Sequence, residues 1–229
     1  AVQSVDLDRW RSVVISDHNI AKSVVRITNS TRNTSCTGFF IAPHVIMTAA
    51  HCFNLGDSLQ AYRQQPQNAK SFMTGKDEFI EIDYQFRDNM WNGDVSQTGA
   101  YDIAFLTTTK ASKNFMPVST ENIKPGRKLM VLGYSGDLND GFFLRIDYGC
   151  RVTSIGKSGH IGNNCAIWSG NSGGPLMTAD GRIAVVGVTS SHKRQPGRSD
   201  DNAKAASTQR GADIFHTVES SDAVKAKIK

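Results

Sequence analysis

Residues 170–175 read G-N-S-G-G-P, which sets Ser172 between glycines. Glycine adopts positive φ at little steric cost, and without a side chain it lets a substrate carbonyl approach the backbone closely. The N–H groups of Gly170 and Ser172 can then converge on the negative charge that develops on that carbonyl oxygen. Ser172 is therefore a candidate nucleophile, and Gly170 and Ser172 are a candidate oxyanion hole. The alternative is a plain glycine-rich turn between two strands.

A serine hydroxyl is a weak nucleophile at neutral pH and needs a base beside it. Residues 48–52 read T-A-A-H-C and supply that base in His51, with small side chains before it that leave room for the imidazole. The base must also be held in one tautomer. Asp102 begins the run D-I-A-F-L, and from a buried edge of this apolar segment its carboxylate can orient His51. Each residue alone is more often structural than catalytic, but together they form a candidate catalytic set.

The rest of the sequence predicts an all-β protein. Short segments rich in β-branched and aromatic residues recur between turn signals, at residues 24–28, 38–41, 45–48, 103–107, 128–134, 151–155 and 183–188. This rhythm is typical of a barrel or sandwich. Helix signals are clearest at the C-terminus, where Ser220 or Ser221 can cap a helix that ends in lysines.

Two polar stretches interrupt this pattern. Residues 108–126 contain two prolines, so we expect the chain to divide there into two halves, 1–115 and 116–229. Residues 190–211 carry no large apolar side chain, and we interpret them as a long loop of the kind that is functional or disordered.

The composition is that of a soluble globular protein, with 39% hydrophobic and 21% charged residues. No apolar run approaches the roughly 18 residues that cross a bilayer, so we expect no membrane span. The net charge of +5 includes basic clusters at residues 193–198 and 225–229, but these lack the interleaved aromatic residues of a nucleic-acid site. We expect a solvated basic surface and no nucleic-acid partner. The sequence opens at Ala1 without a methionine or a charged-then-apolar leader, so any export signal or pro-segment is expected to have been removed or to lie outside this sequence.

Four cysteines, Cys36, Cys52, Cys150 and Cys165, form two close-spaced couples. Pairing within each couple closes loops of roughly 15 residues, each worth about 3 kcal/mol in the chain-entropy picture. That suits an oxidising compartment and predicts a secreted or periplasmic protein. The alternative is four reduced thiols in a cytosolic core. Zinc ligation is not expected, because neither C-x-x-C nor H-x-x-x-H occurs, and we expect no metal and no cofactor.

The three segments T-A-A-H-C, D-I-A-F-L and G-N-S-G-G-P, in this order, resemble the signature segments of the trypsin/chymotrypsin superfamily of serine proteases. The resemblance implies two six-stranded antiparallel barrels with the active site in the cleft between them. Residues 1–115 would form the barrel that carries His51 and Asp102. Residues 116–229 would form the barrel that carries Ser172, followed by the C-terminal helix. The pattern C-T-G-F-F-I at residues 36–41 implies a Cys36–Cys52 disulfide, and we expect Cys150 to pair with Cys165.

The resemblance also implies a function. The chain would be a secreted, monomeric serine endopeptidase that hydrolyses polypeptides through a Ser172–His51–Asp102 triad and an acyl-enzyme intermediate. One alternative is a catalytically inactive protein of the same fold that serves as a binding module. An esterase of another fold is not expected, because the order His51, Asp102, Ser172 is wrong for the class that carries its nucleophile on a G-x-S-x-G elbow.

Within the superfamily, V-L-G-Y-S-G-D at residues 131–137 and G-A-D-I-F at residues 211–215 resemble bacterial secreted proteases related to glutamyl endopeptidases. One departure concerns activation. Asn171 stands where animal digestive enzymes have an aspartate that pairs with a newly released amino terminus. An amide lacks that charge, so activation through this ion pair is not expected.

The resemblance assigns the substrate-binding pocket to Ala166, Thr189, Ser190, Ser191, His192 and Arg210. Ala166 stands six residues before Ser172, where tryptic enzymes have an aspartate, so cleavage after basic residues is expected to be poor. Glutamyl endopeptidases have a histidine where this chain has Thr189. If His192 or Arg210 points into the pocket, an acidic substrate residue is favoured; if both point to solvent, small or apolar residues are favoured.

Overall fold

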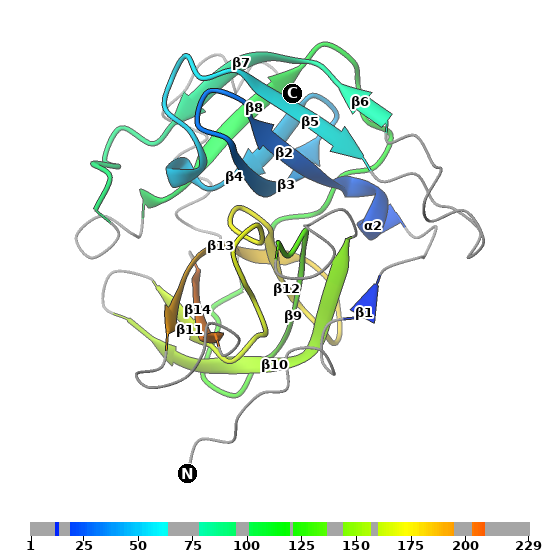
Figure 1. The fold of residues 1–229 in the computed structure, drawn as a ribbon. Coiled ribbons are helices and arrows are strands. Elements are labelled where there is room, and N and C mark those ends of the chain that lie inside the picture. Colours follow the sequence, from blue (N-terminus) through cyan, green and yellow to red (C-terminus); the bar gives the residue numbers. More distant parts are fainter. Residues whose placement is uncertain are drawn as a thin grey trace.

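Antiparallel β-strands make up nearly all the regular structure in the computed structural model (Figure 1). The structure describes residues 12–13, 19–63, 78–94, 101–119, 121–136, 144–156, 160–194 and 203–208. Helix within these residues is limited to α2 (Asn19–Ser23) and the single turn η1 (Ala50–Cys52). The all-β fold predicted from the sequence is confirmed. The predicted C-terminal helix lies outside the described residues.

The first sheet, drawn in the upper half of Figure 1, has the strand order β6-β5-β2-β3-β4-β8-β7. Its strands are β2 (Val24–Asn29), β3 (Thr34–Ala42), β4 (Val45–Thr48), β5 (Leu59–Arg63), β6 (Glu78–Ile80), β7 (Ile82–Arg87) and β8 (Ala104–Thr108). Only Glu81 separates β6 from β7, and together they pair with β5 at one end and β8 at the other. Counted as one interrupted strand, they close the sheet into a barrel of six strands.

The core of this barrel shows why these segments become strands. β3 and β4 bury large side chains, among them Phe39, Phe40 and Ile46, each no more than 1% exposed. Gly38 lets neighbouring strands pack closely, because a Cβ there would lie 2.7 Å from the Ile27 side chain and 2.8 Å from that of Ile46. A glycine inside a strand often marks such a close approach.

The second sheet has the order β1-β10-β11-β14-β13-β12-β9, with a further pairing between β10 and β9. Its strands are β1 (Ser12–Val13), β9 (Lys128–Gly133), β10 (Arg145–Ile155), β11 (Ile161–Asn163), β12 (Pro175–Thr178), β13 (Val185–Arg194) and β14 (Ala203–Thr208). The extra pairing closes six strands into a ring, and β1 is added outside it on β10. β10 reaches both β9 and β11 because its pairing register shifts along its length, which lets a strand bend.

Two expectations about chain organisation need correction. Residues 12–13 pair with the second sheet, although the division at residue 115 assigned them to the first barrel. The stretch 190–211 is not all loop, because it contains the end of β13 and all of β14, which pair with each other. β14 consists of alanine, lysine, serine and threonine, so its pattern lacked the large apolar residues by which the sequence interpretation recognised strands.

Both expected disulfides are present. Cys36 on β3 is joined to Cys52 at the end of η1, and Cys150 on β10 is joined to Cys165. None of the helices in the described residues has the length and apolar character of a membrane-spanning helix.

Candidate active site

His51 and Asp102 meet at one end of the first barrel. His51 lies in η1, directly after β4, and Asp102 comes just before β8. β4 and β8 are antiparallel neighbours, and Thr48 at the end of β4 pairs with Ala104 at the start of β8. This register brings the two flanking residues together, and the disulfide of Cys52 ties the histidine turn to β3.

The Asp102 carboxylate is completely buried and accepts three hydrogen bonds. His51 binds it twice, through its backbone N–H at 2.8 Å to Oδ1 and through Nδ1 at 2.7 Å from Oδ2. Ser190 Oγ donates to Oδ2 at 2.5 Å. A carboxylate offers only acceptors, so Nδ1 carries the imidazole proton and Nε2 is left as the acceptor. The His51 side chain is 31% exposed and can receive a proton from a bound reactant.

Ser172 reaches the same place from the second barrel, through backbone contacts. Its carbonyl oxygen accepts the N–H of Thr37 at 2.8 Å and lies 3.8 Å from Cys52 Sγ. The next residue, Gly173, has a φ of +84°, and a Cβ there would lie 2.1 Å from Thr48 Oγ1. Only glycine fits this approach of the serine turn to the strand that leads into His51.

The serine hydroxyl itself makes no hydrogen bond to His51 among the described residues. Such bonds are often long in the absence of substrate and tighten when it binds. The structure therefore brings His51 and Asp102 into direct contact, and it brings the backbone of Ser172 to Cys52, the residue after His51.

The two candidate oxyanion donors are the N–H groups of Gly170 and Ser172. Within the described chain, no protein acceptor binds the N–H of Gly170 or of Ser172. The carbonyl in each of these two peptide units is anchored, since Ser169 O accepts Gly136 N at 2.7 Å and Asn171 O accepts Gly174 N at 2.9 Å. In a trans peptide the C=O and N–H point in opposite directions, so both N–H groups point away from these anchors. The arrangement leaves two fixed donors available to a substrate oxygen.

The structure describes the side chains of some of the expected pocket residues but not of others. Ala166 is 1% exposed, and its N–H donates to the Asp147 carboxylate at 2.8 Å. Thr189 is also 1% exposed, and its buried hydroxyl has no partner in the described structure. Ser190 binds Asp102. Ser191 and His192 lie in β13, but their side chains, and Arg210 as a whole, are outside the described part.

Sequence reasoning missed Asp147. It lies on β10, is 4% exposed, and accepts the N–H of Gly149 at 2.9 Å in addition to that of Ala166. A buried carboxylate thus binds the backbone of the residue that is expected at the pocket floor. Its bond to the residue two positions later is an Asx turn, in which an aspartate side chain accepts from its own backbone.

A second carboxylate supports the turn after His51. Asp57 accepts the side-chain N–H of Asn29 at 2.7 Å and the backbone N–H of Asn54 at 2.9 Å. The hydrogen bond from Asn29 lowers the pKa of Asp57 most, and the one from Asn54 lowers it next. The nearby charges of Arg32 and Arg87 lower the pKa further by smaller amounts. The same Asn29 side chain donates to Cys52 O at 3.3 Å, so the network reaches the histidine turn.

Asp57→Asn is expected to lower stability at neutral pH and to matter less in acid. A carboxyl group whose pKa is depressed by folding contributes stability above its ordinary value of 3.8, and this contribution is lost as the pH falls through the lower folded value. Urea midpoints of the variant and the wild type should therefore differ more at pH 7 than at pH 3. Glu81→Gln, at an exposed carboxylate that forms no ion pair among the described residues, is the control. A gap that is equal at both pH values would contradict this role.

No metal site emerges from the described residues. The cluster there with metal-ligand spacing is Cys36, His51 and Cys52, whose candidate ligand atoms lie within 4.8 Å of one another. The two sulfurs are bonded to each other, so neither is a thiolate that can bind a metal.

Comparisons with known proteins bear on the family and the fold. Residues 36–188 match the family described as the trypsin-like peptidase domain. The fold is similar to that of the Rv3671c protease from M. tuberculosis in its active form, with 22% identity, 91% of this chain and 82% of that chain covered, and a TM-score of 0.60. No curated protein sequence matches the chain.

Two other solved structures align over similar lengths. Protease Anisep from Arthrobacter nicotinovorans is 18% identical, with 92% of this chain and 98% of that chain covered and a TM-score of 0.66. A Glu endopeptidase is 19% identical, with 92% and 95% covered and a TM-score of 0.66. At these identities the structural neighbours establish a shared fold.

Proposed function

Because the chain belongs to the trypsin-like peptidase family and is a serine endopeptidase, we propose that it cleaves polypeptides with Ser172 as nucleophile, His51 as general base and Asp102 as the residue that orients His51. The superfamily identified from the sequence is thereby confirmed. The observation that carries the assignment of roles is the buried Asp102 carboxylate 2.7 Å from His51 Nδ1. It supports an imidazole whose Nε2 is free to accept a proton.

The chemistry follows from these positions. Ser172 Oγ attacks the scissile carbonyl carbon while its proton passes to His51 Nε2, and the carbonyl oxygen becomes an anion bound by the N–H groups of Gly170 and Ser172. His51 then gives the proton to the departing amine, which leaves an acyl-enzyme. Water, deprotonated by His51, releases the acid and restores the serine. The two disulfides support action in a secreted or periplasmic setting.

We further propose that substrates with a basic residue before the scissile bond are cleaved poorly. Ala166 at the expected floor offers no charge, and Asp147, which binds its backbone, is 4% exposed, with its two oxygens engaged by backbone N–H groups. An arginine or lysine would lose water without gaining a direct anionic partner. Neutral residues are favoured, and acidic residues compete only if His192 or Arg210 faces the pocket.

A peptide library varied only at the residue before the scissile bond tests both the proposed peptidase activity and the proposed specificity. Cleavage after Arg or Lys should be more than about tenfold slower than after the best residue, since an unpaired buried charge costs several kcal/mol. Diisopropyl fluorophosphate should stop all cleavage and should be found attached to Ser172.

Two results would contradict the proposal. Dominant cleavage after Arg or Lys would overturn the specificity and would make Asp147 the first residue to replace. No cleavage of any peptide, together with no labelling of Ser172, would overturn the mechanism and favour an inactive binding module.

A further inference from the structure

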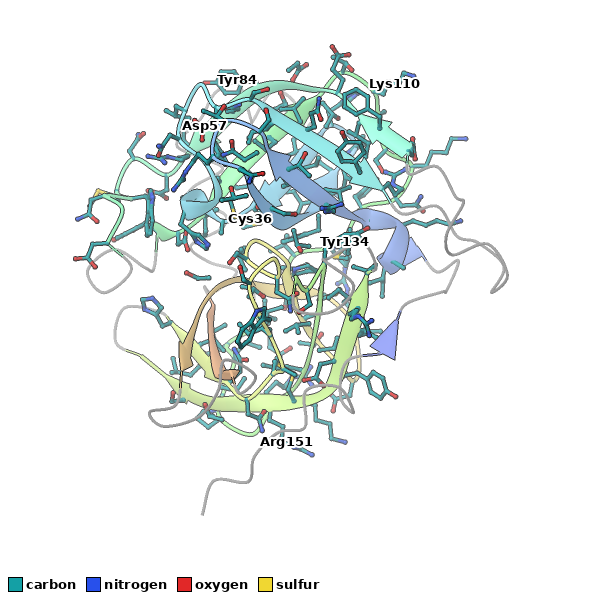
Figure 2. All side chains as sticks on the ribbon, in the orientation of Figure 1. Cys36, Asp57, Tyr84, Lys110, Tyr134 and Arg151 are labelled. Atoms are coloured by element: carbon teal, nitrogen blue, oxygen red, sulfur yellow. A yellow bond between two sulfur atoms is a disulfide. The ribbon has the colours of Figure 1, made fainter. Side chains whose placement is uncertain are left out.

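Thr37 joins the two barrels at the serine turn. It lies on β3, is completely buried, and uses one hydroxyl for two hydrogen bonds to the second barrel. Oγ1 donates to Gly170 O at 2.7 Å and accepts the N–H of Tyr134 at 2.9 Å. Figure 2 labels Tyr134 and Cys36, the residue before Thr37, both near the boundary between the two sheets. These partners are 133 and 97 positions away in the sequence.

The Thr37 hydroxyl binds the middle one of three consecutive peptide units. The two outer units contribute the candidate oxyanion donors, Gly170 N–H and Ser172 N–H, and their carbonyls are anchored by Gly136 and Gly174. The middle unit, between Gly170 and Asn171, is held at both ends. Its carbonyl accepts from Thr37 Oγ1, and its N–H donates to Trp168 O at 3.0 Å.

Without the Thr37 hydroxyl, this peptide unit would be held only through the bond from its N–H to Trp168 O, and it adjoins a glycine, which restricts rotation little. Gly170 has a φ of +99°, in a region that glycine adopts readily and other residues rarely do. Rotation of the middle peptide unit changes ψ of Gly170 and φ of Asn171. Where the two angles do not change by equal and opposite amounts, the outer peptide units turn relative to each other, and their N–H groups no longer converge on one point.

We infer that the Thr37 side chain is a positioning residue for the oxyanion hole, acting through the Gly170 carbonyl; this rests on the proposed function. The hydroxyl suits the role because one atom both donates and accepts. The backbone N–H of Thr37 donates to Ser172 O. Thr37 therefore binds the carbonyl oxygens of both neighbours of Asn171, Gly170 and Ser172. Preorganised donors stabilise charge that exists only in the transition state, so their loss lowers kcat and leaves KM little changed.

The test compares kcat and KM for the wild type, Thr37→Val, Thr37→Ala and Thr37→Ser on one peptide substrate. Removing a whole oxyanion donor costs about 10²- to 10³-fold in kcat, so loosening the donors is expected to cost about 10- to 100-fold. Thr37→Val should show this loss with KM within about threefold of the wild type, since ground-state binding is not affected. Thr37→Ser keeps the hydroxyl and should retain wild-type kcat. Thr37→Ala provides a smaller side chain in case valine does not fit.

Thr178→Val is the matched control. Thr178 is also completely buried, and its hydroxyl donates to Arg182 O at 2.7 Å and accepts Ala184 N–H at 3.1 Å, within the hairpin of β12 and β13. It should lose stability and keep kcat. The inference is overturned if Thr37→Val retains the kcat of Thr178→Val, if the loss is entirely in KM, or if serine fails to restore kcat.

Two further outcomes count against it. If neither Thr37→Val nor Thr37→Ala folds, the hydroxyl is a requirement of folding and not a positioning group. If the wild type and Thr178→Val are also inactive and unlabelled by diisopropyl fluorophosphate, the proposed function itself fails and the inference falls with it.

Discussion

Ser172→Ala is expected to lower kcat by at least about 10⁴-fold while the protein stays folded. The change removes the attacking oxygen and leaves the backbone of the turn in place. Thr37 N–H still binds the carbonyl of residue 172, and Gly173 N–H still binds Thr189 O at 2.7 Å. The serine hydroxyl makes no hydrogen bond within the described residues, so its removal leaves no buried partner unsatisfied. Steady-state kinetics and thermal unfolding measure the two effects.

Ser169→Ala is the control for this prediction, because Ser169 is an exposed serine of the same turn. It should keep its activity and its sensitivity to diisopropyl fluorophosphate. Turnover by Ser172→Ala near the wild-type rate would show that another group attacks the substrate, and the mechanism would have to be abandoned.

The strands that carry the site could be predicted because their signal is local. The expected segment 45–48 coincides with β4 (Val45–Thr48), and 128–134 differs from β9 (Lys128–Gly133) by one residue. β4 lies in the first barrel and β9 in the second, and both are mostly apolar. Each ends beside Thr37, where the two barrels meet. Alternation and β-branching report burial along a strand, so these elements are visible in the sequence.

The residues that hold the site together were not predictable in the same way. Thr37 looks like any strand threonine until Gly170 and Tyr134 are brought to it by a fold that spans 133 positions. The importance of Asp147 likewise depends on its hydrogen bond with Ala166, which lies 19 positions later and is brought to it only by the fold. Motifs locate the reacting groups, whereas the contacts that orient them depend on long-range packing and leave no periodic pattern.

β14 (Ala203–Thr208) illustrates a second limit. It pairs with β11 and β13 through backbone hydrogen bonds, which any non-proline residue can form. Its small and polar residues therefore gave no apolar signal, and the segment was wrongly interpreted as loop.

Asp102→Asn is expected to lower kcat by about 10⁴-fold with little change in fold, because it reverses the tautomer of His51. The aspartate now presents acceptors both to His51 N–H, through Oδ1, and to Nδ1, through Oδ2. An asparagine supplies one acceptor and one donor. If its oxygen faces His51 N–H, its NH2 group faces Nδ1, which must then be unprotonated. The proton moves to Nε2, and His51 can no longer accept one from Ser172. Steady-state kinetics at neutral pH measure the loss.

The opposite orientation of the amide does not rescue the enzyme. Its NH2 group would then face the backbone N–H of His51, and two donors would meet at a position that is 0% exposed, where neither has an acceptor. The first orientation is therefore favoured. Ser190→Ala separates tautomer control from a simple loss of contacts, since it removes the 2.5 Å bond to Oδ2 but leaves the carboxylate on Nδ1. It should cost far less than Asp102→Asn; equal losses in the two variants, or an Asp102→Asn enzyme within tenfold of wild type, would show that Asp102 does not set the tautomer of His51.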